Sequence, residues 1–201
     1  MITPIEFRRH LHRNPELSFE EEQTAQYIEK SLTEAGISHS RIAKTGVLAK
    51  IEGRGDLSKA VVLRADIDAL PIEEQTGLEY ASQNCGVMHA CGHDLHTAML
   101  LGAARLLKNH EGELRGRVKL FFQPAEETLQ GAKTAISKGL LRDPKVDGAM
   151  MLHVMTGVDM PTGSVVVASS GVSAPAADYF NIEVKGKSCH GAAPQNGVDA
   201  L

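Results

Sequence analysis

The segment Met88–Asn109, MHACGHDLHTAMLLGAARLLKN, places three imidazoles and one thiol directly before an apolar run with helical periodicity. Side chains of these types are ligands for transition metals, and such a density of them seldom arises by chance. Cys91 and His93 flank Gly92, which permits a tight turn. The periodicity predicts a helix over Thr97–Asn109. The segment therefore predicts a metal-binding loop that leads into a helix.

Short apolar runs on both sides of this segment predict strands. They are Val47–Ile51, Ala60–Leu63, Val118–Phe122, Ala149–Val154 and Ser164–Ala168. The first two are separated by the turn residues EGRGDLSK, so we expect a hairpin or adjacent strands there. Helical periodicity recurs over Ala132–Lys138. Strands that alternate with helices predict an α/β fold, with a mixed sheet and helices on both of its faces.

Two helices are expected before the first strand. One covers Ile5–Arg13 and ends before Pro15, because the residue preceding a proline is pushed out of the helical region. Ser18 and Glu21 have the spacing of a capping box, which would open a second helix that Gly36 ends. The basic residues of the first helix are interpreted as a solvated face.

Composition excludes several classes of partner. The chain has 201 residues, 42% of them hydrophobic, and a formal net charge of -4, which gives no positive field for nucleic acid or anionic lipid. No apolar run approaches the roughly 20 residues needed to cross a bilayer. Three cysteines form an odd count, and the chain starts without an apolar leader. We therefore expect a cytoplasmic protein with no nucleic-acid or membrane partner.

Further candidate ligands follow the predicted strands at the points where they end. They are Asp66 and Asp68 after VVLRA, Glu126 and Glu127 after VKLFF and a proline, and His153 after GAMML. In open α/β sheets the carboxyl ends of the strands form the ligand crevice. We therefore expect these side chains to meet the cysteine and histidines of the metal-binding loop.

Each candidate also has an ordinary interpretation when it is taken alone. Cys91 and His93 are then a buried thiol and a loop histidine, the glutamate pair is a solvated loop, and His153 is a core histidine. Either aspartate is then a capping residue before Pro71. Together, the groups favour a hydrolytic centre with two divalent metal ions, in which one glutamate binds metal and its neighbour moves a proton. The mixed donors suit Zn or Mn, with Co or Ni as alternatives.

Six blocks of the sequence resemble, in order, the co-catalytic metallo-aminoacylases and amidohydrolases that include hippurate hydrolase, N-acetyldiaminopimelate deacetylase and the auxin-conjugate hydrolases. The blocks are FRRHLHRNPELSFEE, LRADIDALPIEE, MHACGHDLHTAMLLGAA, LFFQPAEET, GAMMLHV and KGKSCHGAAP. They span nearly the whole chain. The resemblance implies a zinc-peptidase-like catalytic domain, interrupted by a smaller α+β lid domain that mediates dimerisation.

The resemblance also implies roles for single residues. The expected metal ligands are Cys91, His93, Glu127 and His153, with the cysteine shared by both ions. Glu126 is the expected general base, and His190 is the expected lid histidine that polarises the scissile carbonyl. Independently of the resemblance, Asp66 and Asp68 lie two positions apart on an extended segment and face the same side, so one of them is expected to orient a ligand histidine from outside the metal shell. Asp66 is the one assigned to the catalytic residues.

Two units are expected along the chain. Residues 1–176 would form part of the catalytic domain, and residues 177–201 would begin the lid, because the small-residue segment SSGVSAPAAD precedes the alternating run DYFNIEVKG. Members of the resembled family are longer and return to the catalytic domain to supply a last metal-binding histidine. The lid loop also carries Ser188 and Cys189 where that family usually has glycines.

The expected reaction is hydrolysis of the amide bond of an N-acyl amino acid or a similar small substrate, by a homodimer. Two alternatives stay open at this point. One is an inactive or binding-only fragment of such an enzyme. The other is a metal-independent hydrolase with Cys91 as the nucleophile, which requires a depressed thiol pKa.

Overall fold

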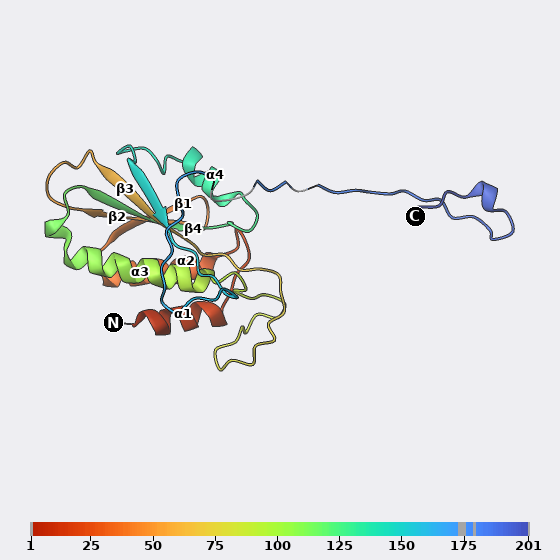
Figure 1. Cartoon of the computed structure of the whole chain (residues 1–201), viewed down its shortest axis with the longest axis horizontal. Helices are drawn as coiled ribbons and strands as arrows, with labels where there is room; N and C mark the ends of the chain where they lie inside the picture. Colours follow the sequence, from red (N-terminus) through yellow and green to blue (C-terminus); the bar gives the residue numbers. More distant parts are fainter. Residues whose placement is uncertain (1, 173–175, 179, 201) are drawn as a thin grey trace. The chain divides into compact units, whose positions relative to one another are not determined.

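The computed structural model describes residues 2–172, 176–178 and 180–200 (Figure 1). These residues fall into two compact units, 1–157 and 158–201. The boundary predicted at residue 177 lies inside the second unit, and the assignment of a lid domain stays a prediction. Residues 173–175 of the predicted linker and Tyr179 of the strand predicted after it lie outside the described residues.

Five strands of the described chain form one mixed sheet in the first unit. They are β1 (Ser38–Ile42), β2 (Gly46–Glu52), β3 (Ala60–Asp66), β4 (Arg117–Gln123) and β5 (Gly148–Met151), in the order β1-β2-β4-β3-β5. Strands β4, β3 and β5 are parallel, whereas β2 is antiparallel to both of its neighbours. The prediction that β2 and β3 are adjacent is wrong, because β4, which is buried along nearly its whole length, lies between them.

Helices cover both faces of the sheet, which confirms the predicted α/β class. Helices α1 (Pro4–Arg13), α2 (Glu22–Glu34) and α3 (His93–Asn109) lie on one side and α4 (Gly131–Ser137) on the other (Figure 1). Neighbouring residues of β4 point to opposite faces. Phe122 therefore packs in the core under α1, α2 and α3, and Phe121 packs with Ala135 of α4. Burial of each such side chain contributes about 1.5–3 kcal/mol.

The helix starts differ from the predictions. Helix α2 begins at Glu22, and the side chains of Ser18 and Glu21 do not form the predicted capping box. Instead, both side chains point into the protein. The Ser18 hydroxyl donates to the Asp68 carboxylate, and the Glu21 carboxylate accepts from the backbone N–H of Ala125. Helix α3 begins at His93, so this histidine lies in the first helical turn, whereas Cys91 lies in the preceding loop.

The strand predictions also need correction. Strand β1 was not predicted, because its polar sequence SHSRI lacks apolar alternation. Strand β5 ends at Met151 instead of Val154. Among the described residues of the second unit, neither Ser164–Ala168 nor residues 180–186 form a strand. Val165–Val167 are exposed, and an apolar run becomes a strand only when a neighbour accepts its hydrogen bonds.

The second unit contains a short 3₁₀ helix, Pro194–Asn196, and one isolated bridge between Lys187 and Val198. No helix in the described part of the chain is both long and apolar enough to cross a membrane.

Candidate metal centre

The predicted site residues of the first unit gather where three adjacent parallel strands end. Asp66 is the last residue of β3, Glu126 follows β4, and His153 follows β5. The first turn of α3 begins at the same edge with His93. This is the carboxyl edge of the parallel part of the sheet, where α/β folds place their ligand crevice.

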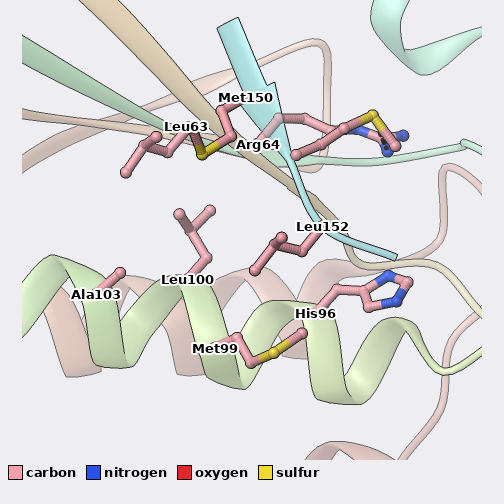
Figure 2. A pocket seen from close by; sticks show the side chains of 9 residues that line it. Leu63, Arg64, His96, Met99, Leu100, Ala103, Met150 and Leu152 are labelled. Carbon is pink, nitrogen blue, oxygen red and sulfur yellow. Dashed lines mark hydrogen bonds between the residues drawn. The ribbon is translucent and has the colours of Figure 1, made fainter. Parts of the chain in front are cut away.

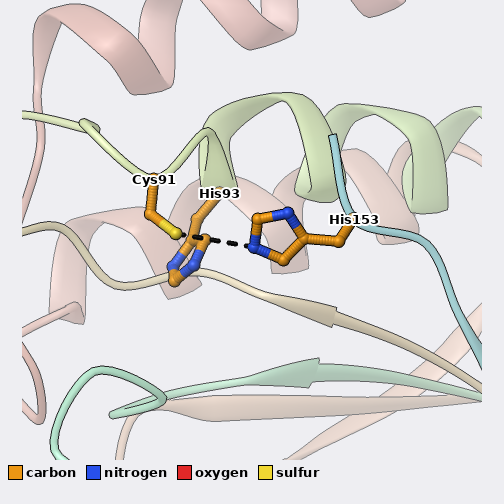
Figure 3. A group of neighbouring side chains, drawn as sticks. All are labelled: Cys91, His93 and His153. Carbon is orange, nitrogen blue, oxygen red and sulfur yellow. Dashed lines mark hydrogen bonds between the residues drawn. The ribbon is translucent and has the colours of Figure 1, made fainter. Parts of the chain in front are cut away.

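His93 is the member shared by three groups of side chains whose donor atoms all lie within 4.8 Å of one another. The groups are Cys91, His93 and His153; His93, Glu126 and Glu127; and Asp66, His93 and His96. Figure 3 shows the first group, in which the Cys91 sulfur faces Nε2 of His153 at 3.5 Å. The structure therefore brings the four predicted ligands and the predicted base together.

The imidazole of His93 is held from one side and offers its other nitrogen to the site. Its Nδ1 lies 2.9 Å from the backbone oxygen of Asp68 and 3.3 Å from that residue's carboxylate. Its Nε2 lies 3.6 Å from the Asp66 carboxylate and 3.7 Å from that of Glu127. This nitrogen is buried and makes no hydrogen bond with any described residue. A buried imidazole nitrogen that faces carboxylates and a thiol fits a divalent cation.

His153 is arranged in the same way, although its side chain is exposed. Its Nδ1 donates to the backbone oxygen of Val154 at 2.7 Å, which leaves Nε2 directed at Cys91. Ligand histidines in metal sites commonly use one nitrogen for such an orienting hydrogen bond and the other for the metal. Both predicted histidine ligands have this arrangement.

The electrostatics of the site favour a bound cation. Burial and the nearby carboxylates of Glu127 and Asp66 raise the pKa of Cys91 to about 12. Burial also raises the pKa of Glu127, and Glu126 and Asp68 add to this effect while His93 opposes it. Burial disfavours the charged imidazolium of His93, but Asp68 and Asp66 still raise its pKa. A divalent cation would offset the negative charge that these groups concentrate.

Asp66 and Asp68 each lie beside Nδ1 of a different histidine. Asp68 is the carboxylate beside Nδ1 of His93. Asp66 instead accepts from Nδ1 of His96 at 2.6 Å and pairs with Arg64 at 2.9 Å. Although burial alone raises the pKa of Asp66, these partners and His93 lower it to about 2. The catalytic assignment of Asp66 stays a prediction, and the contact that orients His93 comes from Asp68.

The sequence predicts no ligand role for His96, yet its side chain links two parts of the site. While Nδ1 bonds to Asp66, its Nε2 accepts from the backbone N–H of Val154 at 2.9 Å. Both ring nitrogens are therefore occupied, so His96 is not available as a ligand. Instead, it ties the end of β3 to the residue that follows His153. Its three-residue spacing from His93 on α3 is the sequence signal for this proximity.

His190 belongs to the second unit and is exposed. Its Nδ1 accepts from the backbone N–H of Ala192 at 3.2 Å. Its predicted role in polarising the scissile carbonyl stays a prediction.

A small apolar pocket of about 170 Å³ lies next to this centre, between α3 and strands β3 and β5 (Figure 2). Leu63, Leu100 and Leu152 point into it, and His96 stands at one end. Met150 of the edge strand β5 also lines the pocket and is exposed. The metal centre therefore borders an apolar wall on the β5 side.

Comparison with known proteins connects this geometry to one family. Residues 62–196 match peptidase family M20/M25/M40. The chain is 50% identical over 198 residues to an N-acetyl-L-cysteine deacetylase of Bacillus subtilis, covering 98% of this chain and 46% of the relative. It is 42% identical over 199 residues to an N-acyl-L-amino acid amidohydrolase of Geobacillus stearothermophilus, covering 98% of this chain and 52% of the relative.

A solved structure supports the same relationship. The crystal structure of a Bacillus subtilis dinuclear metal binding peptidase from the M20 family superposes with a TM-score of 0.68 at 47% identity, over 72% of this chain and 41% of that one. The chain spans about half the length of these curated relatives.

Proposed function

Because this chain belongs to peptidase family M20/M25/M40, we propose that the protein is a metal-dependent amidohydrolase that acts on N-acyl amino acids or similar small substrates. The observation that carries this proposal is the buried Nε2 of His93. It faces the carboxylates of Asp66 and Glu127 and belongs to the same donor group as Cys91. Two relatives named for removing acyl groups from amino acids indicate the substrate class.

The proposed ligands of two divalent ions are Cys91, His93, Glu127 and His153, which meet at one sheet edge. Zn and Mn suit this mixed donor set best, with Co and Ni as alternatives. When bound, such ions lower the pKa of a coordinated water and polarise the scissile carbonyl. A relative described as binding a dinuclear metal supports the number of ions.

Glu126 is the proposed general base. Its carboxylate lies 3.9 Å from Nε2 of His93, and its side chain is 33% exposed, so it borders the ligands and is still open to solvent. In the proposed reaction Glu126 accepts a proton from the attacking water and donates it to the nitrogen of the leaving amine. Asp68 holds His93 in the orientation that presents Nε2.

The cysteine-hydrolase alternative is less well supported. A nucleophilic cysteine needs a lowered thiol pKa, whereas burial and carboxylates raise the pKa of Cys91 to about 12. The binding-only alternative is not favoured either, because the predicted base and ligands lie together at one edge. The homodimer, the cytoplasmic location and the role of His190 remain predictions.

Chelation distinguishes the metal-dependent reaction from thiol catalysis. The whole protein is treated with chelator and assayed for release of amino acids from N-acetyl amino acids, before and after addition of Zn, Mn, Co or Ni. We expect activity to disappear with chelator and to return with at least one ion. Full activity in metal-free protein would exclude the proposed reaction.

A further inference from the structure

The turn that carries Glu126 and Glu127 is anchored by a buried carboxylate from the N-terminal part of the chain. The side chain of Glu21, just before α2, is fully buried. One of its oxygens accepts from the backbone N–H of Ala125 at 2.8 Å, and the other accepts from the hydroxyl of Thr45 at 2.5 Å. Glu21 therefore joins the β1–β2 turn to the residue that precedes the proposed base.

Ala125 needs such an anchor. It is fully buried, so its N–H would have no water to bind if Glu21 were removed. Its φ of 50° lies in the left-handed region, which costs roughly 1–2 kcal/mol for a residue with a Cβ. Its carbonyl closes the turn by accepting from Gln130 and Gly131 at 3.2 and 3.0 Å. Surrounding contacts must hold this conformation.

A second anchor acts on the far side of the proposed base. The N–H of Glu127 donates to the Asp68 carboxylate at 3.0 Å, and the same oxygen accepts from the Ser18 hydroxyl at 2.7 Å. Ser18 and Glu21 thus support the turn from both sides of Glu126. They are the two residues whose spacing predicted a helix cap, and neither touches the reacting groups.

We propose that Glu21 is a positioning residue, whose carboxylate holds the Ala125 amide so that Glu126 and Glu127 face His93. This inference rests on the proposed function, because it concerns the geometry of the proposed base and ligand. A displacement of about 1 Å in a reacting group can cost on the order of 10²-fold in rate. Loss of a group that supports a ligand lowers metal affinity by about 10–100-fold.

The test compares Glu21→Met, Glu21→Gln and Glu22→Met in the whole protein. Methionine offers the Ala125 N–H only a weakly accepting thioether sulfur, whereas glutamine keeps one oxygen for that N–H and can donate to Thr45. Glu22→Met makes the same change at an adjacent exposed position. We expect Glu21→Met to lower kcat by about 10²-fold with KM nearly unchanged. Glutamine should restore kcat to within about threefold, and the control should retain it.

Binding of Co²⁺ gives a readout that does not depend on turnover. The sulfur-to-cobalt absorption band should appear in the wild type, and Glu21→Met should need about tenfold more Co²⁺ to reach it. Wild-type protein that binds no Co²⁺ would refute the proposed function itself. Wild-type binding and activity that Glu21→Met leaves unchanged would refute only the positioning role.

A measurement on the wild type keeps the inference testable if Glu21→Met does not fold. We expect slow hydrogen–deuterium exchange at the Ala125 amide in the wild type and in Glu21→Gln. The inference would be overturned if the Ala125 amide of the wild type exchanged as fast as an exposed loop amide. It would also be overturned if kcat of Glu21→Gln were as low as that of Glu21→Met.

Discussion

Replacement of Asp66 by asparagine should cost a defined amount of stability that depends on pH. Asp66 is 1% exposed, and its pKa falls from 3.8 to about 2 because the opposing effect of burial is outweighed by His96, His93 and Arg64. A difference of nearly two units between the unfolded and folded states corresponds to about 2 kcal/mol. Metal-free protein near neutral pH should therefore lose about this much in Asp66→Asn.

The direction of the pH effect follows from the lowered pKa. A carboxylate that ionises more easily in the folded state stabilises the fold fully above its unfolded pKa of 3.8. This contribution declines as the pH falls through the folded value near 2. Linkage predicts that about half of it remains at about pH 3. Asparagine does not titrate, so the two proteins should approach each other in stability as the pH falls.

Urea unfolding of chelator-treated protein, followed by circular dichroism at several pH values, measures this difference. Asp159→Asn, at an exposed position in the second unit, is the matched control and should show little difference from the wild type at any pH. A stability difference between wild type and Asp66→Asn that stays constant from neutral pH to about pH 3 would refute the reasoning.

Three further predictions address the base, the packing of α1 and the far face of the sheet. Glu126→Gln should lower kcat by about 10²–10⁴-fold while metal content, measured by elemental analysis, stays that of the wild type; an unchanged kcat would contradict its role. His12 lies between Asp94 and Glu74, and its hydrogen bond to Asp94 raises its pKa, so its stabilising effect is complete below 6.5 and is lost as pH rises through the raised value. Urea unfolding should therefore show the wild type, but not His12→Gln, losing this contribution as the pH rises above 6.5, and parallel curves would oppose this explanation. Buried Lys119 donates to three backbone carbonyls, so Lys119→Met should cost about 3 kcal/mol in thermal unfolding, and a loss within experimental error would show that these bonds contribute nothing.

Strong apolar patterns made much of the fold predictable from the sequence. The run Val118–Phe122 is buried on both faces of the sheet and forms the centre of β4 as expected. The polar strand β1 was missed because it lies at the edge of the sheet, where backbone pairing with β2 stabilises it without an apolar pattern. The order of the strands in the sheet could not be predicted from local sequence patterns. Strand β4 lies between β2 and β3 because it pairs with strands that are distant from it in the sequence.

The candidate site was predictable to the extent that strand ends determine position. The ends of β3, β4 and β5 bring Asp66, Glu126 and His153 to the same edge as His93. The division of Asp66 and Asp68 between two histidines depends on side-chain directions that residue spacing does not specify. The buried position of the Glu21 side chain was not predicted, because the spacing of Ser18 and Glu21 is also typical of a helix cap.

The central claim is that Cys91 shares a metal ion with residues distant from it in the sequence. X-ray absorption at the zinc edge of the Zn-loaded whole protein tests this claim most directly. We expect one sulfur scatterer at about 2.3 Å among lighter nitrogen and oxygen ligands, and its loss in Cys91→Ser. A wild-type spectrum with nitrogen and oxygen ligands alone, or a sulfur signal that persists in Cys91→Ser, would contradict the claim.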